Sequence, residues 1–102
     1  MLEVLNVLKE YEAMVIIDSN LEDEKIAAVV TKIQGIIKKN GGSVDKVDEW
    51  GKRKMAYPIQ KQETGYYAVF YLKAPEDSIK EMNRVLRISD DVLRHMIFRK
   101  DE

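Results

Sequence analysis

The chain has 102 residues, 45% of them hydrophobic, which suits one domain with a packed core and excludes global disorder. It has no cysteine, which excludes disulfides and thiolate metal sites, and no apolar run near the roughly 20 residues of a membrane span. Residues 1–50 hold six basic and ten acidic residues, whereas residues 51–102 hold eleven and eight. The cationic second half is compatible with a nucleic-acid partner but lacks the charge of a histone-like protein.

The start of the chain is apolar but too short to predict an element. Residues 1–9 are compatible with an added strand, a helical turn or a leader, and we treat them as an extension to a single domain over residues 10–102. They lack a cationic leader and a small-residue cleavage site, so we expect no secretory signal. The absence of cysteine also fits a reducing compartment.

A strand and an amphipathic helix are predicted next. Residues 11–17 alternate between two partly apolar faces, which indicates a central strand. Asp18-Ser19-Asn20 supplies helix-capping oxygens, and apolar residues then recur at helical spacing from Ile26 to Ile37. Asn40-Gly41-Gly42 ends this helix.

Two strands follow. Residues 43–59 predict a long strand with a bulge or bend at Gly51. Pro58 cannot donate to a ladder, which places this strand, or at least its end, at an edge of the sheet. Residues 60–64 predict a hairpin loop. Residues 65–73 predict a second central strand, because both of its faces are apolar.

The chain closes with a helix and a strand. Residues 74–77 open the helix, with proline in its first turn. Its apolar stripe consists of Ile79, Met82, Val85 and Leu86. Residues 90–91 turn the chain into a last strand, residues 92–99. The facing of that strand is ambiguous, because one apolar set (Val92, Met96, Phe98) competes with another (Leu93, Ile97).

The order strand, helix, strand, strand, helix, strand predicts an α+β fold, the ferredoxin-like βαββαβ sandwich. Right-handed crossovers place both helices on one face of a four-stranded antiparallel sheet. The other face is then open and carries a large apolar patch, which on a small protein usually marks a partner surface. The patch comprises Met14, Ile16, Tyr67, Val69 and Tyr71.

No residue set indicates catalysis. His95 is the only histidine, and the acidic pairs in residues 22–24 and 90–91 are explained by helix entry and a turn. We therefore expect neither an enzyme nor a bound metal or cofactor.

The run from Thr64 to Tyr71 approaches the aromatic signature of RNA-recognition motifs, but the basic residue before its glycine is missing and the small residue comes one place late.

One cationic stretch remains. Lys52, Arg53 and Lys54 lie between Trp50 and Tyr57, so they can hold phosphates next to aromatic rings. The alternative is a solvated edge strand whose cations discourage aggregation.

This stretch resembles the signature of the bacterial small-subunit ribosomal protein six family. The pattern is Gly, any residue, basic, polar or charged, Leu, Ser or Ala, Tyr, any residue, Ile, and the chain departs from it only at Met55. The resemblance spans about residues 10–100. Other landmarks are Tyr11-Glu12, Gly65-Tyr66-Tyr67, and Leu86-Arg87-Ile88 followed by Asp90, Val92, Arg94 and Met96.

The resemblance implies a cytoplasmic structural ribosomal protein that binds small-subunit ribosomal RNA in the central domain, or platform, as a heterodimer with ribosomal protein eighteen. It implies Arg87 and Arg94 as first RNA contacts. Charge and location add Arg84, His95, Arg99, Lys100, Lys52, Arg53 and Lys54. The partner surface would use Met14, Ile16, Tyr67, Val69, Tyr71 and Trp50. The alternative function is a self-associating ferredoxin-like module that binds a small molecule or partner protein through its open face.

Overall fold

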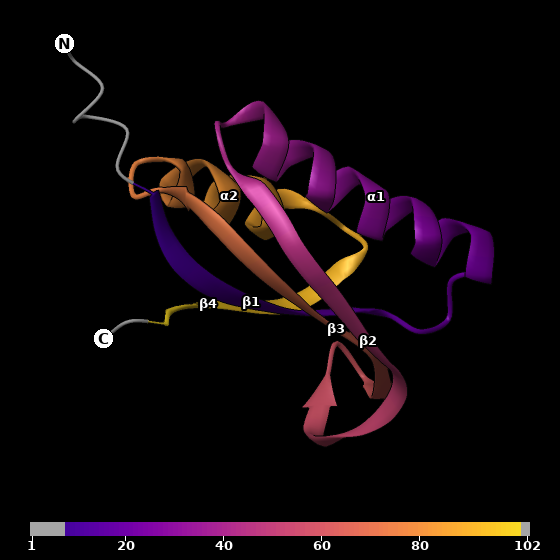
Figure 1. Ribbon diagram of the computed structural model, residues 1–102. Coiled ribbons are helices and arrows are strands. Elements are labelled where there is room, and N and C mark those ends of the chain that lie inside the picture. The colour runs from indigo at the N-terminus through magenta and orange to yellow at the C-terminus, as the bar shows by residue number, and fades with distance from the viewer. Residues whose placement is uncertain (1–7, 101–102) are drawn as a thin grey trace, which may run out of the picture.

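The computed structural model describes residues 8–100, in which four strands form one antiparallel sheet and two helices cover one of its faces (Figure 1). This is the predicted α+β, ferredoxin-like arrangement. The elements are β1 (Leu8–Asp18), α1 (Asp23–Lys39), β2 (Ser43–Ile59), β3 (Gln62–Pro75), α2 (Ser78–Ile88) and β4 (Val92–Arg99).

The strand order β2-β3-β1-β4 makes β1 and β3 central and β2 an edge, as predicted. β1 begins before the predicted strand, because Leu8 and Lys9 already pair with Pro75 and Ala74. Part of the apolar start of the chain therefore continues the first strand, whereas residues 1–7 lie outside the described residues.

The helix α1 has the predicted apolar stripe, but its first turn is built differently. Glu22 is the N-cap and makes no side-chain capping bond. The Asp18 carboxylate instead accepts a hydrogen bond from the Asn20 N–H at 2.9 Å, so these residues stabilise the turn before the helix. At the other end Gly41, with φ of 87°, ends the helix as predicted.

The hairpin between β2 and β3 is tighter than the predicted five-residue loop. Ile59 pairs with Gln62, which leaves only Gln60 and Lys61 in the turn, both with positive φ. Positive φ at both central residues gives the turn a twist that matches the twist of the two strands, so β2 and β3 stay paired up to the turn. The predicted irregularity at Gly51 is confirmed by a register shift there and a φ of 84°.

The second helix begins later than predicted. Pro75 is the last residue of β3, where it pairs with Leu8, rather than a first-turn residue of α2. The helix starts at Ser78, whose hydroxyl donates to the Pro75 carbonyl at 2.7 Å.

Neither of the two predicted facings of β4 is correct, because a bulge mixes them. Ile16 pairs with Arg94, but Ile17 pairs with Val92, so Leu93 is an extra residue. Val92 and Ile97 consequently pack with the core on the helix side.

The hydrophobic core lies between the sheet and the two helices. The central strands contribute alternate residues to it, among them Phe70 and Ile17, which have no exposed surface. The helices contribute Ile33, Ile37 and Met82, each at most 2% exposed. This layer uses one face of the sheet and leaves the other to be covered by something else.

Candidate functional site

The sheet face turned away from the helices, which we call the open face, carries three rows of side chains. Cross-strand pairing places β1 between β3 and β4 on this face, so that residues of the three strands lie side by side. The rows consist of Glu12, Met14 and Ile16 on β1; Tyr71, Val69 and Tyr67 on β3; and Phe98, Met96 and Arg94 on β4.

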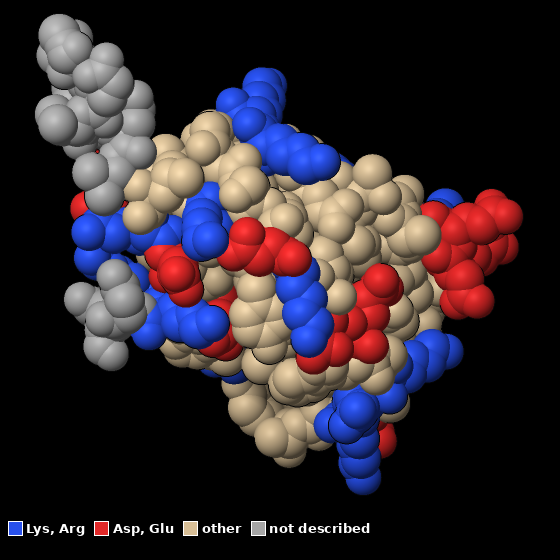
Figure 2. All heavy atoms as spheres, in the orientation of Figure 1, with Lys and Arg blue, Asp and Glu red and all other residues tan. Residues whose placement is uncertain are grey.

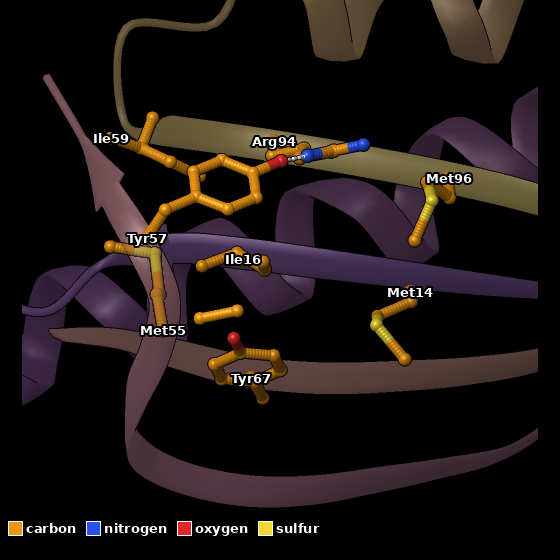
Figure 3. A pocket seen from close by; sticks show the side chains of 9 residues that line it. Met14, Ile16, Met55, Tyr57, Ile59, Tyr67, Arg94 and Met96 are labelled. Carbon is orange, nitrogen blue, oxygen red and sulfur yellow. Dashed lines mark hydrogen bonds between the residues drawn. The ribbon is translucent and has the colours of Figure 1, made fainter. Parts of the chain in front are cut away.

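The last part of β2, residues 55–59, folds over one end of the open face, and we call this segment the arm. The Arg94 guanidinium on β4 donates a hydrogen bond to the Tyr57 hydroxyl on β2 and lies 5.8 Å from the centre of that ring. These strands occupy opposite edges of the sheet, about 14 Å apart at ordinary strand spacing. The contact therefore requires the arm to cross over β3 and β1. Figure 1 shows that the end of β2 curls, and Figure 3 shows the arm running across the central strands.

A pocket of about 210 Å³ lies between the arm and the open face (Figure 3). The arm forms one wall and the sheet forms the floor. Methionine and isoleucine side chains dominate the lining, and the Tyr57–Arg94 contact closes one side. The lining residues are Met14, Ile16, Met55, Ala56, Tyr57, Ile59, Tyr67, Arg94 and Met96.

Two groups of aromatic and cationic side chains lie on the open face beside the pocket. The Trp50 and Tyr67 rings are stacked, with centroids 6.0 Å apart and planes at 10°. The Arg53 guanidinium lies 5.9 Å from the Trp50 ring. Farther along β3, the ammonium groups of Lys46 and Lys100 lie 5.9 Å and 6.0 Å from the Tyr71 ring. Each ring therefore already contacts a cation or another ring.

The predicted partner residues all belong to this face or its margin, but they differ in exposure. Ile16 and Val69 are only 7% and 4% exposed, so they support the surface more than they present it. Met14, Tyr67 and Tyr71 are half-buried, and Trp50 is 41% exposed. Their role in partner binding stays a prediction.

Sequence reasoning did not group Met55, Ile59 or the β4 residues with this face. Tyr57 and Phe98 are 54% and 52% exposed, and Met55 is buried at 6%. Met96 reaches the open face because of the bulge at Leu93. A bulge and a curled strand end leave no local periodicity that a sequence pattern could reveal.

The nine cationic RNA candidates fall into three separate groups. Arg94 and Lys100 lie at the open face, and the triplet Lys52-Arg53-Lys54 lies on the exposed stretch before the arm. Figure 2 shows basic side chains around the tip of the β2–β3 hairpin and acidic side chains at the first turn of α1. The third group belongs to the helix side and consists of Arg84, Arg87, His95 and Arg99.

Two cations of this third group are engaged in ion pairs. Arg84 makes a two-point contact with the Glu81 carboxylate at 2.6 Å and 3.0 Å, which lowers the pKa of Glu81. Arg99 lies 3.7 Å from Glu76. Arg87 is exposed in the last turn of α2.

His95 and Tyr66, also on the helix side, have shifted pKa values as well. Burial lowers the pKa of His95, and the nearby positive charge of Arg87 lowers it further. The imidazole shares a hydrogen bond of 3.1 Å with the Asn83 side chain. On β3, a 2.6 Å hydrogen bond to Glu49 is the main cause that raises the pKa of Tyr66 to about 12.

Residues 8–100 contain no cluster of acidic, histidine or cysteine side chains that could hold a metal ion. Within the same residues, no helix is long and apolar enough to cross a membrane.

Known proteins are similar to this chain in both fold and sequence. The crystal structure of 30S ribosomal protein S6 from Thermotoga maritima superposes with a TM-score of 0.89 at 31% identity, covering 93% of this chain and 90% of that one. The small ribosomal subunit protein bS6 of Carboxydothermus hydrogenoformans is 44% identical over 93% of this chain and 99% of its own length. That of Corynebacterium urealyticum is 43% identical over 93% of this chain and all of its own length.

The family model described as ribosomal protein S6 matches residues 10–99. This match confirms the resemblance drawn from the Trp50–Ile59 stretch, and it includes the open face, the arm and both helices. The family is one of structural ribosomal proteins rather than enzymes, which confirms that prediction as well. The chain belongs to the ribosomal protein S6 family.

Proposed function

We propose that this chain is a structural constituent of the small ribosomal subunit in the cytoplasm, where it binds small-subunit ribosomal RNA together with ribosomal protein eighteen. The observation that carries the proposal is the open face. The helices leave it uncovered, the arm covers only one end of it, and Trp50 and Phe98 keep 41% and 52% of their surface exposed. An aromatic surface of this kind favours a protein partner.

The RNA contact that we test first is Arg87. It lies in the last turn of α2 on the helix side of the sheet, so a phosphate can reach it while a partner occupies the open face. Arg84 lies one turn earlier but is already bound to Glu81. The two arginines form a matched pair on one helix: both are exposed, but only Arg84 is held by a carboxylate among the ion pairs of the described residues.

A gel-shift assay on a central-domain RNA fragment, with and without ribosomal protein eighteen, tests the proposal. We expect weak binding by this chain alone and much tighter binding once the partner is added. No partner-dependent shift would refute the proposal. Sedimentation of the chain alone provides the second measurement, because a stable homodimer that binds neither RNA nor the partner would instead support the self-associating module.

Arg87→Ala is expected to weaken the complete complex and to reduce the steepness of its salt dependence by about one released counterion. Arg84→Ala is the control, and we expect it to leave both quantities nearly unchanged because Arg84 is held by Glu81. Affinities measured across a salt series give both values. Equal effects of the two substitutions, or an unchanged salt slope for Arg87→Ala, would place the RNA contact elsewhere.

A further inference from the structure

We propose that the pocket beneath the arm is an anchor site for a protein partner, and that it takes a bulky apolar side chain whose neighbouring carboxylate pairs with Arg94. The inference rests on the proposed function only for the identity of that partner. It also gives Arg94 a role on the partner surface, in place of the RNA contact implied by the family resemblance.

The size and the lining of the pocket suit one side chain. An apolar cavity of about 150 Å³ accommodates benzene, so a pocket of about 210 Å³ has room for a leucine or phenylalanine side chain. Met14, Met55 and Met96 line it from three different strands. Methionine side chains are flexible and polarizable, and they adapt to the shape of what they enclose. Pockets that enclose one apolar side chain often dominate the binding energy of an interface.

The charge around the pocket favours a particular kind of group next to the apolar side chain of the partner. Among the described residues that line the pocket, Arg94 is the charged one and none is acidic. Tyr57 accepts one of the five hydrogen bonds that a guanidinium can donate, which leaves donors for a carboxylate of the partner. The exposed triplet Lys52-Arg53-Lys54 precedes the arm and adds positive charge. Electrostatic complementarity therefore favours an acidic group beside the apolar side chain.

The same features disfavour a nucleobase. Proteins hold single-stranded bases on free aromatic faces and read their edges with hydrogen-bonding groups. Here Tyr67 is stacked on Trp50, and the Tyr57 hydroxyl is already bonded to Arg94. Most of the remaining lining is methionine and isoleucine, which cannot hydrogen-bond to a base edge in the way that amide or charged side chains do.

The methionines allow a test that needs no partner protein. The full chain is labelled with ¹³C at its methionine methyl groups, and its NMR spectra are recorded while N-acetyl-phenylalanine is added. This probe joins an apolar ring to a carboxylate. We expect saturating shifts at Met14, Met55 and Met96, with a dissociation constant in the millimolar range. Met82 is the internal control. It is buried in the helix-side core, with 1% of its surface exposed, so its signal should not shift.

Two substitutions at Arg94 test the carboxylate contact. Arg94→Gln removes the charge and is expected to weaken binding of N-acetyl-phenylalanine about tenfold, whereas Arg94→Lys keeps the charge and should weaken it about threefold or less. N-acetyl-phenylalaninamide, which lacks the carboxylate, should bind wild type and both variants equally weakly. An unchanged Met82 signal in each variant shows that the core is intact.

Several results would overturn the inference. The pocket is not an anchor site if N-acetyl-phenylalanine leaves the three pocket methionines unmoved, or if adenosine monophosphate moves them instead. The role of Arg94 is wrong if Arg94→Gln binds the carboxylate probe as wild type does. The assay with ribosomal protein eighteen separates failure of this inference from failure of the proposed function. If the chain binds N-acetyl-phenylalanine but not ribosomal protein eighteen, only the identity of the partner is refuted. If it binds ribosomal protein eighteen but not N-acetyl-phenylalanine, only the anchor site is refuted.

Discussion

The two faces of the sheet are covered in different ways. On the helix side, α1 and α2 bury alternate residues of β1 and β3, and Phe70 has no exposed surface. On the open face the chain covers only one end, with its own arm, while Phe98 stays 52% exposed. Stability therefore depends mainly on the helix side, because burial of apolar surface drives folding. The open face is left for recognition.

The largest expected effect tests this division with one residue type on each face. Phe70→Ala removes a fully buried ring and is expected to cost about 3–5 kcal/mol of the free energy of unfolding. Phe98→Ala removes a half-exposed ring and should cost less than about 1 kcal/mol. Urea unfolding followed by circular dichroism measures both. Similar losses for the two variants would mean that the open face contributes to stability as much as the core does.

A smaller effect tests how tightly the residues beneath the arm are packed. A Cβ at Gly65 would lie 2.4 Å from Ile16 Cγ2 and 3.4 Å from the Met55 sulfur, so Gly65→Ala overpacks the layer beneath the arm. We expect a loss of about 1–3 kcal/mol. The control is Gly35→Ala, which has open space in the middle of α1 and should gain about 0.5–1 kcal/mol. Thermal unfolding gives both values, and a neutral Gly65→Ala would show that the Ile16 side chain can shift without cost.

The smallest effect concerns pH and the helix side. Because the pKa of His95 is lowered from 6.5 in the folded chain, the unfolded chain takes up this proton first as the pH falls. The stabilisation by neutral His95 is complete above about pH 6.5 and is lost as the pH falls through the folded pKa. His95→Gln should abolish this part of the pH dependence. The measurement is the difference in unfolding free energy between wild type and variant from pH 7.5 to pH 5, and a constant difference would contradict the prediction.

Much of the fold could be predicted because its signals are local. The stripe from Ile26 to Ile37 follows the period of a helix, and the alternation in residues 11–17 and 65–73 follows that of strands. Gly51 and Pro58 correctly indicated a bulged edge strand. Pro75 misled, because proline at the start of a helix and proline at the end of a strand satisfy the same backbone constraint.

The candidate site was only half predictable. Its β1 and β3 residues follow from strand alternation, and the cationic residues are visible in the sequence. How the cationic residues group in space is not visible in the sequence. Arg94 meets Tyr57 across the width of the sheet, whereas Arg84 and Arg87 lie on the opposite, helix side. Residues 37 positions apart in the chain carry no shared local pattern.

The sequence by itself determined the order of elements, the two-layer α+β architecture and, through the stretch from Trp50 to Ile59, the family. Periodicity and turn chemistry are properties of neighbouring residues, so they can be read along the chain. Only the tertiary structure decided that the arm crosses the open face, that the bulge at Leu93 turns Met96 toward it, and that Arg94 closes a pocket. These features depend on which surfaces meet once the sheet has formed, because packing between distant residues overrides local preference.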